Sequence, residues 1–307
     1  MLPIWKGLRH SLPELALIAA TIAYGATFVI VQNALDDATP VGFILLRFTV
    51  GTIALAPIAI HRGFRREGVD ARTREFVFAA IVFGLTGFAG YWFQNAGLER
   101  TSTSNSAFIT GLFVVFTPVI EMVVTRRLPD PRVLIAVAVS AVGLFLLTGA
   151  SLQLHSGDAL TLGCAVMFAL WIFLGHRFSQ RFDPIALTCA QMAVLAVSAV
   201  PVVLIGGLGH VTAGVVRAVF VTGLLCSALA FTLQLWGQRH VEPSRAAVVL
   251  LFEPVVAGFV GYLVGERLGV KGYVGAIVIF GGIVLAESRA WRARAYGREA
   301  LAEPPYG

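Results

Sequence analysis

Ten long apolar runs alternate with short polar segments along the chain. Each run is bounded by charged residues or by proline and glycine, and each is close to the roughly 20 residues that a helix needs to cross a bilayer. None shows the alternating ten-residue strands of a membrane β-barrel, and a helix satisfies its own backbone in lipid. The pattern therefore predicts an all-α integral membrane protein with ten transmembrane helices, over residues 12–34, 41–61, 75–98, 102–125, 131–149, 157–178, 184–206, 211–237, 243–264 and 270–288.

The composition supports this interpretation. Of the 307 residues, 57% are hydrophobic and 13% are charged, whereas soluble domains are about a quarter charged and just under half apolar. These values exclude a soluble globular enzyme, a disordered chain and a nucleic-acid-binding domain. They predict that the chain is embedded in a lipid bilayer. The three cysteines lie inside apolar runs without metal-ligand spacing, so neither a disulfide framework nor a metal site is expected. Nucleotide-binding, hydrolase and metalloprotease motifs are missing, so the sequence predicts no cofactor and no enzyme activity.

The basic residues predict how the helices are oriented. When successive loops are assigned to opposite sides of the membrane, one side receives eighteen lysines and arginines and the other side four. Cytoplasmic loops carry such an excess, so both termini and the 62–74 loop are expected in the cytoplasm. The net charge of +6 then reflects orientation and not an acidic ligand. Lys6 and Arg9 precede the first run as in a signal peptide, but the run is long and lacks a clear cleavage site, which favours a retained helix.

The two halves of the chain resemble each other at a nearly constant shift. Around the second and seventh runs the shift is 144 residues, and it pairs Pro40 with Pro184 and Pro57 with Pro201. Through the third and fourth runs the shift is 140, and it pairs Gln94 with Gln234, Gly97 with Gly237, Ser104 with Ser244 and Ala107 with Ala247. Chance similarity between apolar sequences is the alternative. A duplication predicts two five-helix units, over 12–149 and 157–288, with a basic cytoplasmic tail over 289–307. Because five is odd, the units enter the membrane in opposite orientations, as in many secondary transporters.

The second half carries motifs that resemble those of a known family. Residues 243–247, 252–255 and 265–268 resemble the signature of the EamA family, within the drug/metabolite transporter superfamily. The first half has a weaker copy, in which Arg126 stands where the second half has Glu266. The resemblance implies a ten-helix carrier in a bacterial inner membrane that moves small metabolites and often exports amino acids. It also implies a central cavity lined by helices one to four and six to nine.

Charged residues inside the apolar runs are the first candidates for a role in transport, because a charge in the membrane needs a partner or a cavity. Glu253 lies about halfway along the ninth run, where it could bind a proton or a substrate ammonium group, or serve as a hydrogen-bonded structural carboxyl. Arg47, in the second run, could hold a substrate carboxylate with its forked guanidinium, or reach headgroups or backbone carbonyls. Glu121 is expected to pair locally with Arg126 and Arg127.

Aromatic and amide side chains recur at matching positions of the two halves. The third run places Tyr91 and Gln94 on one helical face, and the eighth run places Phe231 and Gln234 on the matching face. A ring beside an amide suits a cavity for small amphipathic solutes, and ordinary helix packing is the alternative. The isolated His176 is expected to be solvated near a membrane face. The predicted substrate-binding residues are Tyr24, Phe28, Arg47, Tyr91, Gln94, Trp171, Phe231, Gln234 and Glu253.

These features together favour a secondary transporter that exports small metabolites by alternating access. Amino acids, including aromatic or other hydrophobic ones, are the expected substrates. The alternatives are a drug or metabolite efflux carrier of the same fold, an intramembrane lipid-modifying enzyme, and a scaffold or sensor subunit. Uniport and proton exchange are both compatible with the sequence, as are a monomer and a homodimer.

Overall fold

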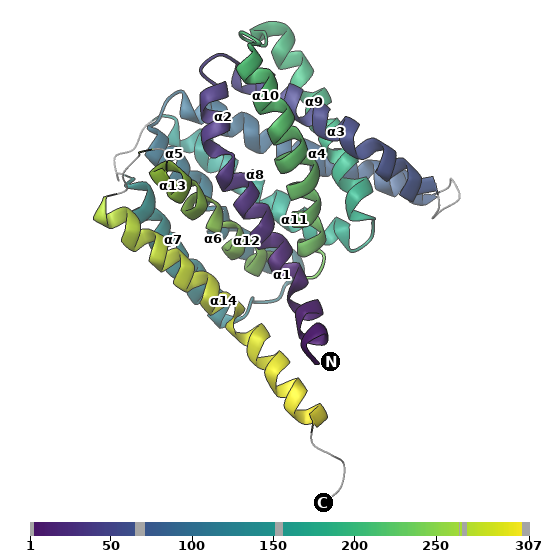
Figure 1. Cartoon of the computed structure of the whole chain (residues 1–307), viewed down its shortest axis with the longest axis vertical. Helices are drawn as coiled ribbons and strands as arrows, with labels where there is room; N and C mark the ends of the chain where they lie inside the picture. Colours follow the sequence, from purple (N-terminus) through teal and green to yellow (C-terminus); the bar gives the residue numbers. More distant parts are fainter. Residues whose placement is uncertain (1–2, 65–70, 151–155, 264, 266–268, 303–307) are drawn as a thin grey trace, which may run out of the picture.

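The computed structural model describes residues 3–64, 71–150, 156–263, 265 and 269–302 (Figure 1). Within these residues the chain is helical apart from short turns and one isolated bridge between Ala38 and Gly209. Ten of its helical segments are long and apolar enough to cross a membrane, and they agree with the ten predicted runs to within a few residues. The prediction of an all-α protein with ten spans is confirmed. The 266–268 part of the Gly-Glu-Arg-Leu motif lies outside the described residues, as do the side chains of 63–72 and of the tail from 289 onward.

The spans are numbered one to ten in chain order. Six of them are single helices: α3 (Pro40–Phe64), α4 (Ala71–Leu98), α7 (Pro131–Thr148), α8 (Asp158–Ser179), α9 (Pro184–Gly206) and α14 (Val270–Ala302). Span one is divided into α1 (Pro3–Ala26) and α2 (Phe28–Ala34), and span four into α5 (Thr103–Gly111) and α6 (Phe113–Thr125). Span eight consists of α10 (Ala213–Thr222), the π-helix η1 (Gly223–Ala230) and α11 (Phe231–Gln238), and span nine of α12 (Pro243–Leu250) and α13 (Phe252–Leu263).

Short polar residues determine where several spans begin. Asp130 and Asp183 each precede a proline at the first helical position, and their carboxylates accept hydrogen bonds from backbone N–H groups of the first turn. Proline suits that position because its missing N–H would have no partner there. Ser102 and Thr212 accept such bonds at the starts of α5 and α10. The sequence therefore sets these helix starts locally.

Successive loops gather at opposite ends of the bundle. We define the proximal end as the one where α1 begins and α14 ends (Figure 1), and the distal end as the opposite one. At the distal end, Thr39 N–H donates to the Leu208 carbonyl over 3.0 Å, and this joins the loops after spans one and seven. At the proximal end, Arg62 forms an ion pair with Asp183 at 3.6 Å, between the end of α3 and the start of α9. This alternation is what ten spans joined by short loops require.

Most of the contacts between spans recur when the two halves are exchanged. Spans two and seven, four and nine, and five and ten each pack against their own counterpart. Span one packs on spans eight and nine, and span six correspondingly packs on spans three and four. Span two packs on span eight as span seven packs on span three. Spans five and ten, α7 and α14, lie together at one edge of the bundle, beside spans four and nine (Figure 1).

Two glycines mark equivalent close approaches in the two halves. A Cβ on Gly97 would lie 3.1 Å from the Gly157 carbonyl oxygen, because α4 meets the start of span six there. A Cβ on Gly237 would lie 2.7 Å from the Pro13 carbonyl oxygen, because α11 meets the start of span one. The shifts of 140 and 144 relate both the glycines and the carbonyl residues. Small residues let membrane helices approach closely, and here they do so at matching places.

Spans four and nine are interrupted near their middles by almost the same local geometry. Leu112 divides span four with φ −63° and ψ −3°, and Leu251 divides span nine with φ −66° and ψ −4°. Pro254 has no N–H to donate to the Leu250 carbonyl one turn earlier, which weakens the helix at that level. Pro118 lies six residues beyond Leu112, so its missing N–H accounts for only part of the interruption in span four.

Candidate functional site

A cluster of aromatic rings joins spans from both halves at the centre of the bundle. The rings of Tyr24 and Phe231 lie 5.7 Å apart, centroid to centroid, in an edge-on arrangement. Phe48 contacts both Phe231 and Tyr91, each at 5.7 Å. Tyr91 in turn meets Phe168 edge-on at 5.3 Å. Spans one, two, three, six and eight each contribute a ring, so the cluster depends on the packing of both halves.

Trp171 extends this cluster and is held in place by an amide. Its indole stacks on Phe83 at 5.3 Å and contacts Phe231 at the same distance. The indole Nε1–H donates to Gln191 Oε1 over 3.0 Å. Gln191 is buried, with 1% of its surface exposed, whereas Trp171 keeps part of its surface exposed. Such an aromatic surface with a fixed orientation suits the apolar part of a small solute.

Two further polar contacts connect the halves. The Tyr24 hydroxyl donates to Gln234 Oε1 over 2.8 Å, and Arg47 Nε donates to Ser227 Oγ over 2.9 Å. Ser227 belongs to the π-helix of span eight. The residue before Ser227 also contacts the first half: Cys226 Sγ lies 2.8 Å from Thr27 Oγ1, at the point where span one is divided. Irregular helix geometry at membrane depth is common at functional sites.

Glu253 and Arg47 place opposite charges at this centre without pairing with each other. Glu253 lies in the first turn of α13, two residues after Leu251, and is half-buried. Within the described part of the chain, its carboxylate has no hydrogen bond or ion pair, and the two terminal nitrogens of Arg47 donate to no acceptor. Arg47 and Glu253 nevertheless lie in the same neighbourhood as Tyr24 and Tyr91. The centre therefore offers one guanidinium and one carboxyl group to a ligand.

The structure brings seven of the nine predicted residues into this site: Tyr24, Arg47, Tyr91, Trp171, Phe231, Gln234 and Glu253. It does not bring in Phe28, which begins α2 with 49% of its surface exposed and makes no ring contact within the described residues. Gln94 is half-buried and forms no hydrogen bond there, unlike its counterpart Gln234. The reason is chemical, because the shift of 144 places Phe168 where the first half has Tyr24, and Phe168 has no hydroxyl to donate.

Four residues of the site were missing from the sequence prediction: Phe48, Phe83, Phe168 and Gln191. The repeat could have identified two of them, since Phe168 and Gln191 follow Tyr24 and Arg47 at the shift of 144. The ring pairs Tyr24–Phe231 and Tyr91–Phe168 are then counterparts, and both have an interplanar angle of 78°. Arg47 and Gln191 are counterparts with different chemistry, so the guanidinium of the site belongs to the first half alone. No group of three or more His, Cys, Asp or Glu side chains among the described residues could hold a metal.

Two expectations about the proximal end are wrong. Glu121 does not pair with Arg126 or Arg127, since its Oε2 accepts hydrogen bonds from the backbone N–H (3.1 Å) and the hydroxyl of Ser244 on span nine. His176 is not merely solvated, because its Nδ1 lies 2.6 Å from the Gln238 carbonyl oxygen on span eight. Both residues connect spans across the bundle and so belong to its tertiary packing.

Comparison with known proteins agrees with this architecture. A crystal structure with 16% sequence identity superposes with a TM-score of 0.78, over 92% of this chain and 99% of the other. An uncharacterized transporter of Archaeoglobus fulgidus is 29% identical over 286 residues, which cover 92% of this chain and 88% of that protein. The uncharacterized transporter YyaM of Bacillus subtilis is 23% identical over 291 residues, covering 91% of this chain and 94% of YyaM.

The pattern of the EamA-like transporter family matches the chain twice, over residues 11–149 and 155–287. These two segments include every residue of the aromatic cluster as well as Arg47 and Glu253. Together with the ten spans, the match identifies a multi-pass membrane transporter. The chain belongs to the EamA-like transporter family.

Proposed function

We propose that this transporter exports amino acids, chiefly aromatic or other hydrophobic ones, from the cytoplasm of a bacterium across its inner membrane. One observation carries the proposal: Arg47 and Glu253 bring a guanidinium and a carboxyl group, neither with an ion-pair partner among the described residues, to the same aromatic-lined centre. A zwitterion places a carboxylate and an ammonium group on one carbon, so it can satisfy both charges at once. The free terminal nitrogens of Arg47 suit a carboxylate, because a guanidinium donates two parallel hydrogen bonds.

The remaining groups of the site match the rest of such a substrate. Trp171, Phe231 and Tyr91 provide apolar surface for a hydrophobic side chain. The transport mechanism that we propose is alternating access, in which two inverted five-helix units expose this centre first to one side and then to the other. It is supported by the exchange symmetry of the span contacts and by the matched interruptions at Leu112 and Leu251. The basic-residue distribution supports cytoplasmic termini.

A substrate panel with paired analogues tests the proposal. Purified protein in proteoliposomes is preloaded with unlabelled solute, and counterflow of phenylalanine is compared with that of phenethylamine, 3-phenylpropionate and glycine. Phenylalanine, which has both charges and a ring, is expected to exchange fastest. A marked fall in phenylalanine exchange in Arg47→Ala and in Glu253→Gln, with empty liposomes as blanks, would support the assignment of both groups.

The competing candidate is a carrier of hydrophobic cations, in which Glu253 alone recognises the substrate. Equal counterflow of phenethylamine and phenylalanine, insensitive to Arg47→Ala, would favour this carrier and overturn the amino-acid proposal. Absence of counterflow for every solute of the panel would overturn it as well.

A further inference from the structure

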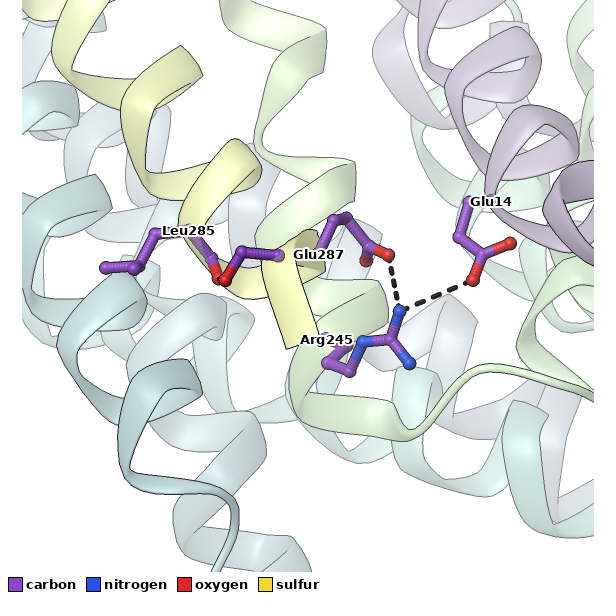
Figure 2. A network of polar contacts seen from close by, with 5 residues as sticks. Glu14, Arg245, Leu285 and Glu287 are labelled. Atoms are coloured by element: carbon purple, nitrogen blue, oxygen red, sulfur yellow. Dashed lines mark hydrogen bonds and ion pairs between the residues drawn. The ribbon is translucent and has the colours of Figure 1, made fainter. Parts of the chain in front are cut away.

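The proximal end contains a buried cluster of charges that is separate from the central site. Arg245, on α12, lies between Glu14 on α1 and Glu287 on α14, and the carboxylates of both point toward its guanidinium (Figure 2). Arg245 Nη2 lies 3.3 Å from Glu14 Oε1 and also donates to Glu287 Oε2. Both glutamates are buried, and the Arg245 side chain is 17% exposed. One nitrogen thus links spans one, nine and ten.

The neighbouring residue attaches α12 to a fourth span. Ser244 donates from both its backbone N–H and its hydroxyl to Glu121 Oε2 on α6. The backbone N–H groups of a first helical turn have no partner within the helix, so this carboxylate satisfies one of them. Two adjacent residues therefore attach the first turn of α12 to spans one, four and ten.

The two ends of the bundle differ in how tightly the equivalent helices are packed. The shift of 140 makes α12, at the proximal end of span nine, the counterpart of α5, at the distal end of span four. Every residue of α12 except Arg245 is buried, whereas α5 buries only Asn105, Ser106 and Gly111. Ala247 has 0% of its surface exposed, and its counterpart Ala107 is exposed.

The contacts of spans four and nine show the same difference. At the proximal end α12 packs on α6, and it also packs on α1 and α8. At the distal end α5 and α13 form no comparable contact with each other within the described residues, and α5 packs on α8 but not on α1. Among the described residues, spans four and nine are therefore joined at the proximal end and not at the distal end, so these two spans form a bundle that is closed proximally and open distally.

The charged cluster has no equivalent at the open end. Arg245 corresponds to Asn105, and Glu121 corresponds to Gly261, so neither the cation nor that carboxylate is present in the other half. Only Glu14 has an acidic counterpart, Asp158, which accepts a hydrogen bond from Thr101 over 2.6 Å. Among the described residues, the counterpart positions at the open end therefore lack this arginine–carboxylate pair, and the end that has it is the closed one.

We propose that Arg245, with Glu14, Glu287 and the adjoining Ser244–Glu121 contact, forms the proximal gate of the transport cycle, and that these contacts must separate before substrate reaches the central site from the cytoplasm. This inference rests on the proposed function, because it assigns the cytoplasmic gate of that export cycle. Because the ion pairs form only while the proximal gate is closed, they stabilise the distal-open state relative to the proximal-open state. Removing the cation shifts the population toward the proximal-open state, since a two-state equilibrium follows the difference in stability between its states.

Two reporter cysteines at equivalent positions test the gate. Ala247→Cys and Ala107→Cys are made separately in full-length protein in which Cys164, Cys189 and Cys226 are replaced by alanine. The rate of reaction with a membrane-impermeant maleimide is measured in proteoliposomes, from the side that each reporter faces. In otherwise unchanged protein, position 107 is expected to react rapidly and position 247 slowly.

Arg245→Gln is expected to raise the reaction rate at position 247 by about tenfold, equivalent to a shift of about 1.4 kcal/mol, and to lower the rate at position 107. Arg245→Lys keeps the charge and is expected to stay near the original rates. Arg126→Gln is the matched control, because it removes an exposed arginine near the proximal end of α6 that makes no ion pair with a described residue. Unchanged rates in folded Arg245→Gln protein would overturn the proposal. A rise at both positions would also overturn it, since that result indicates general loosening of the packing.

Glu121→Gln provides a second test if Arg245→Gln does not fold. It weakens the bonds from Ser244 and is expected to shift both rates in the same directions by a smaller factor, and the absence of a reciprocal change would count against the gate. Counterflow in the otherwise unchanged protein separates this inference from the proposed function. A reciprocal shift without amino-acid counterflow retains the gate and removes the substrate proposal. Counterflow without a reciprocal shift removes only the gate.

Discussion

Replacing Arg47 by lysine separates the charge at the central site from its geometry. Arg47 Nε donates to Ser227 Oγ over 2.9 Å, and both terminal nitrogens are left available for a ligand. Lysine keeps the positive charge but has a single ammonium group, so it cannot bond Ser227 and both oxygens of a carboxylate in the same way. A hydrogen bond to a charged group contributes about 1.5–3 kcal/mol. Loss of one such bond should weaken binding of a carboxylate substrate roughly 10- to 150-fold.

The measurement is the dissociation constant of phenylalanine for purified protein, with the Michaelis constant for counterflow as a second readout. Phenethylamine lacks the carboxylate, so its weaker binding should be unaffected by Arg47→Lys. Ser227→Ala is the matched control, because it leaves the guanidinium fork intact and removes only the bond that orients it. We expect this variant to weaken phenylalanine binding less than Arg47→Lys does. An unchanged dissociation constant in a folded Arg47→Lys variant would show that Arg47 is a structural residue.

Three further predictions concern coupling, packing and topology. Glu253→Gln should retain some exchange but lose any stimulation by a pH gradient, because Glu253 is the carboxyl group of the central site; stimulation that persists in flux assays would locate coupling elsewhere. Gly97→Val and Gly237→Val should each destabilise the protein by about 1–3 kcal/mol in thermal unfolding, whereas Gly281→Ala should not, since a Cβ there meets no atom within 4 Å. A single cysteine in the 62–74 loop should react with impermeant maleimide only from the cytoplasmic side, and labelling from outside would reverse the topology.

The positions of the spans could be read from the sequence because each depends on local properties. A run of apolar residues must be helical in lipid, and charged residues mark where each run ends. Asp130 and Asp183 then begin the next helices by capping their first turns. The interruptions within the spans were less accessible. A proline inside a helix generally signals bending, and spans four and nine contain Pro118 and Pro254. The interruptions nevertheless lie at Leu112 and Leu251, and the one in span one, at Thr27, has no proline nearby.

The central site was only partly predictable, because it depends on which faces of distant helices meet. Arg47 and Glu253 stood out since each is a charge inside an apolar run. Gln191 and Phe168 are ordinary residues in their own helices and acquire a role only when span six or seven is placed against its neighbours. Glu121 shows the converse, since nearby arginines suggested a local partner, whereas tertiary packing supplied Ser244, 123 residues away in sequence.

Equivalent positions of the two halves are alike at one site of close helix packing and differ in the central site, and this difference bears on mechanism. At one pair of close approaches both halves keep the same residue, Gly97 and Gly237, because a larger side chain would clash at either place. At the centre the counterparts differ: Arg47 has Gln191 as its equivalent, Tyr24 has Phe168, and Tyr91 has Phe231. Alternating access needs two states of similar energy, so it constrains the packing positions equally in both halves. Binding an asymmetric solute needs distinct groups at its two ends, and it therefore favours divergence at the central positions. A symmetric scaffold around an asymmetric site is the combination expected of a carrier whose substrate has one positive and one negative end.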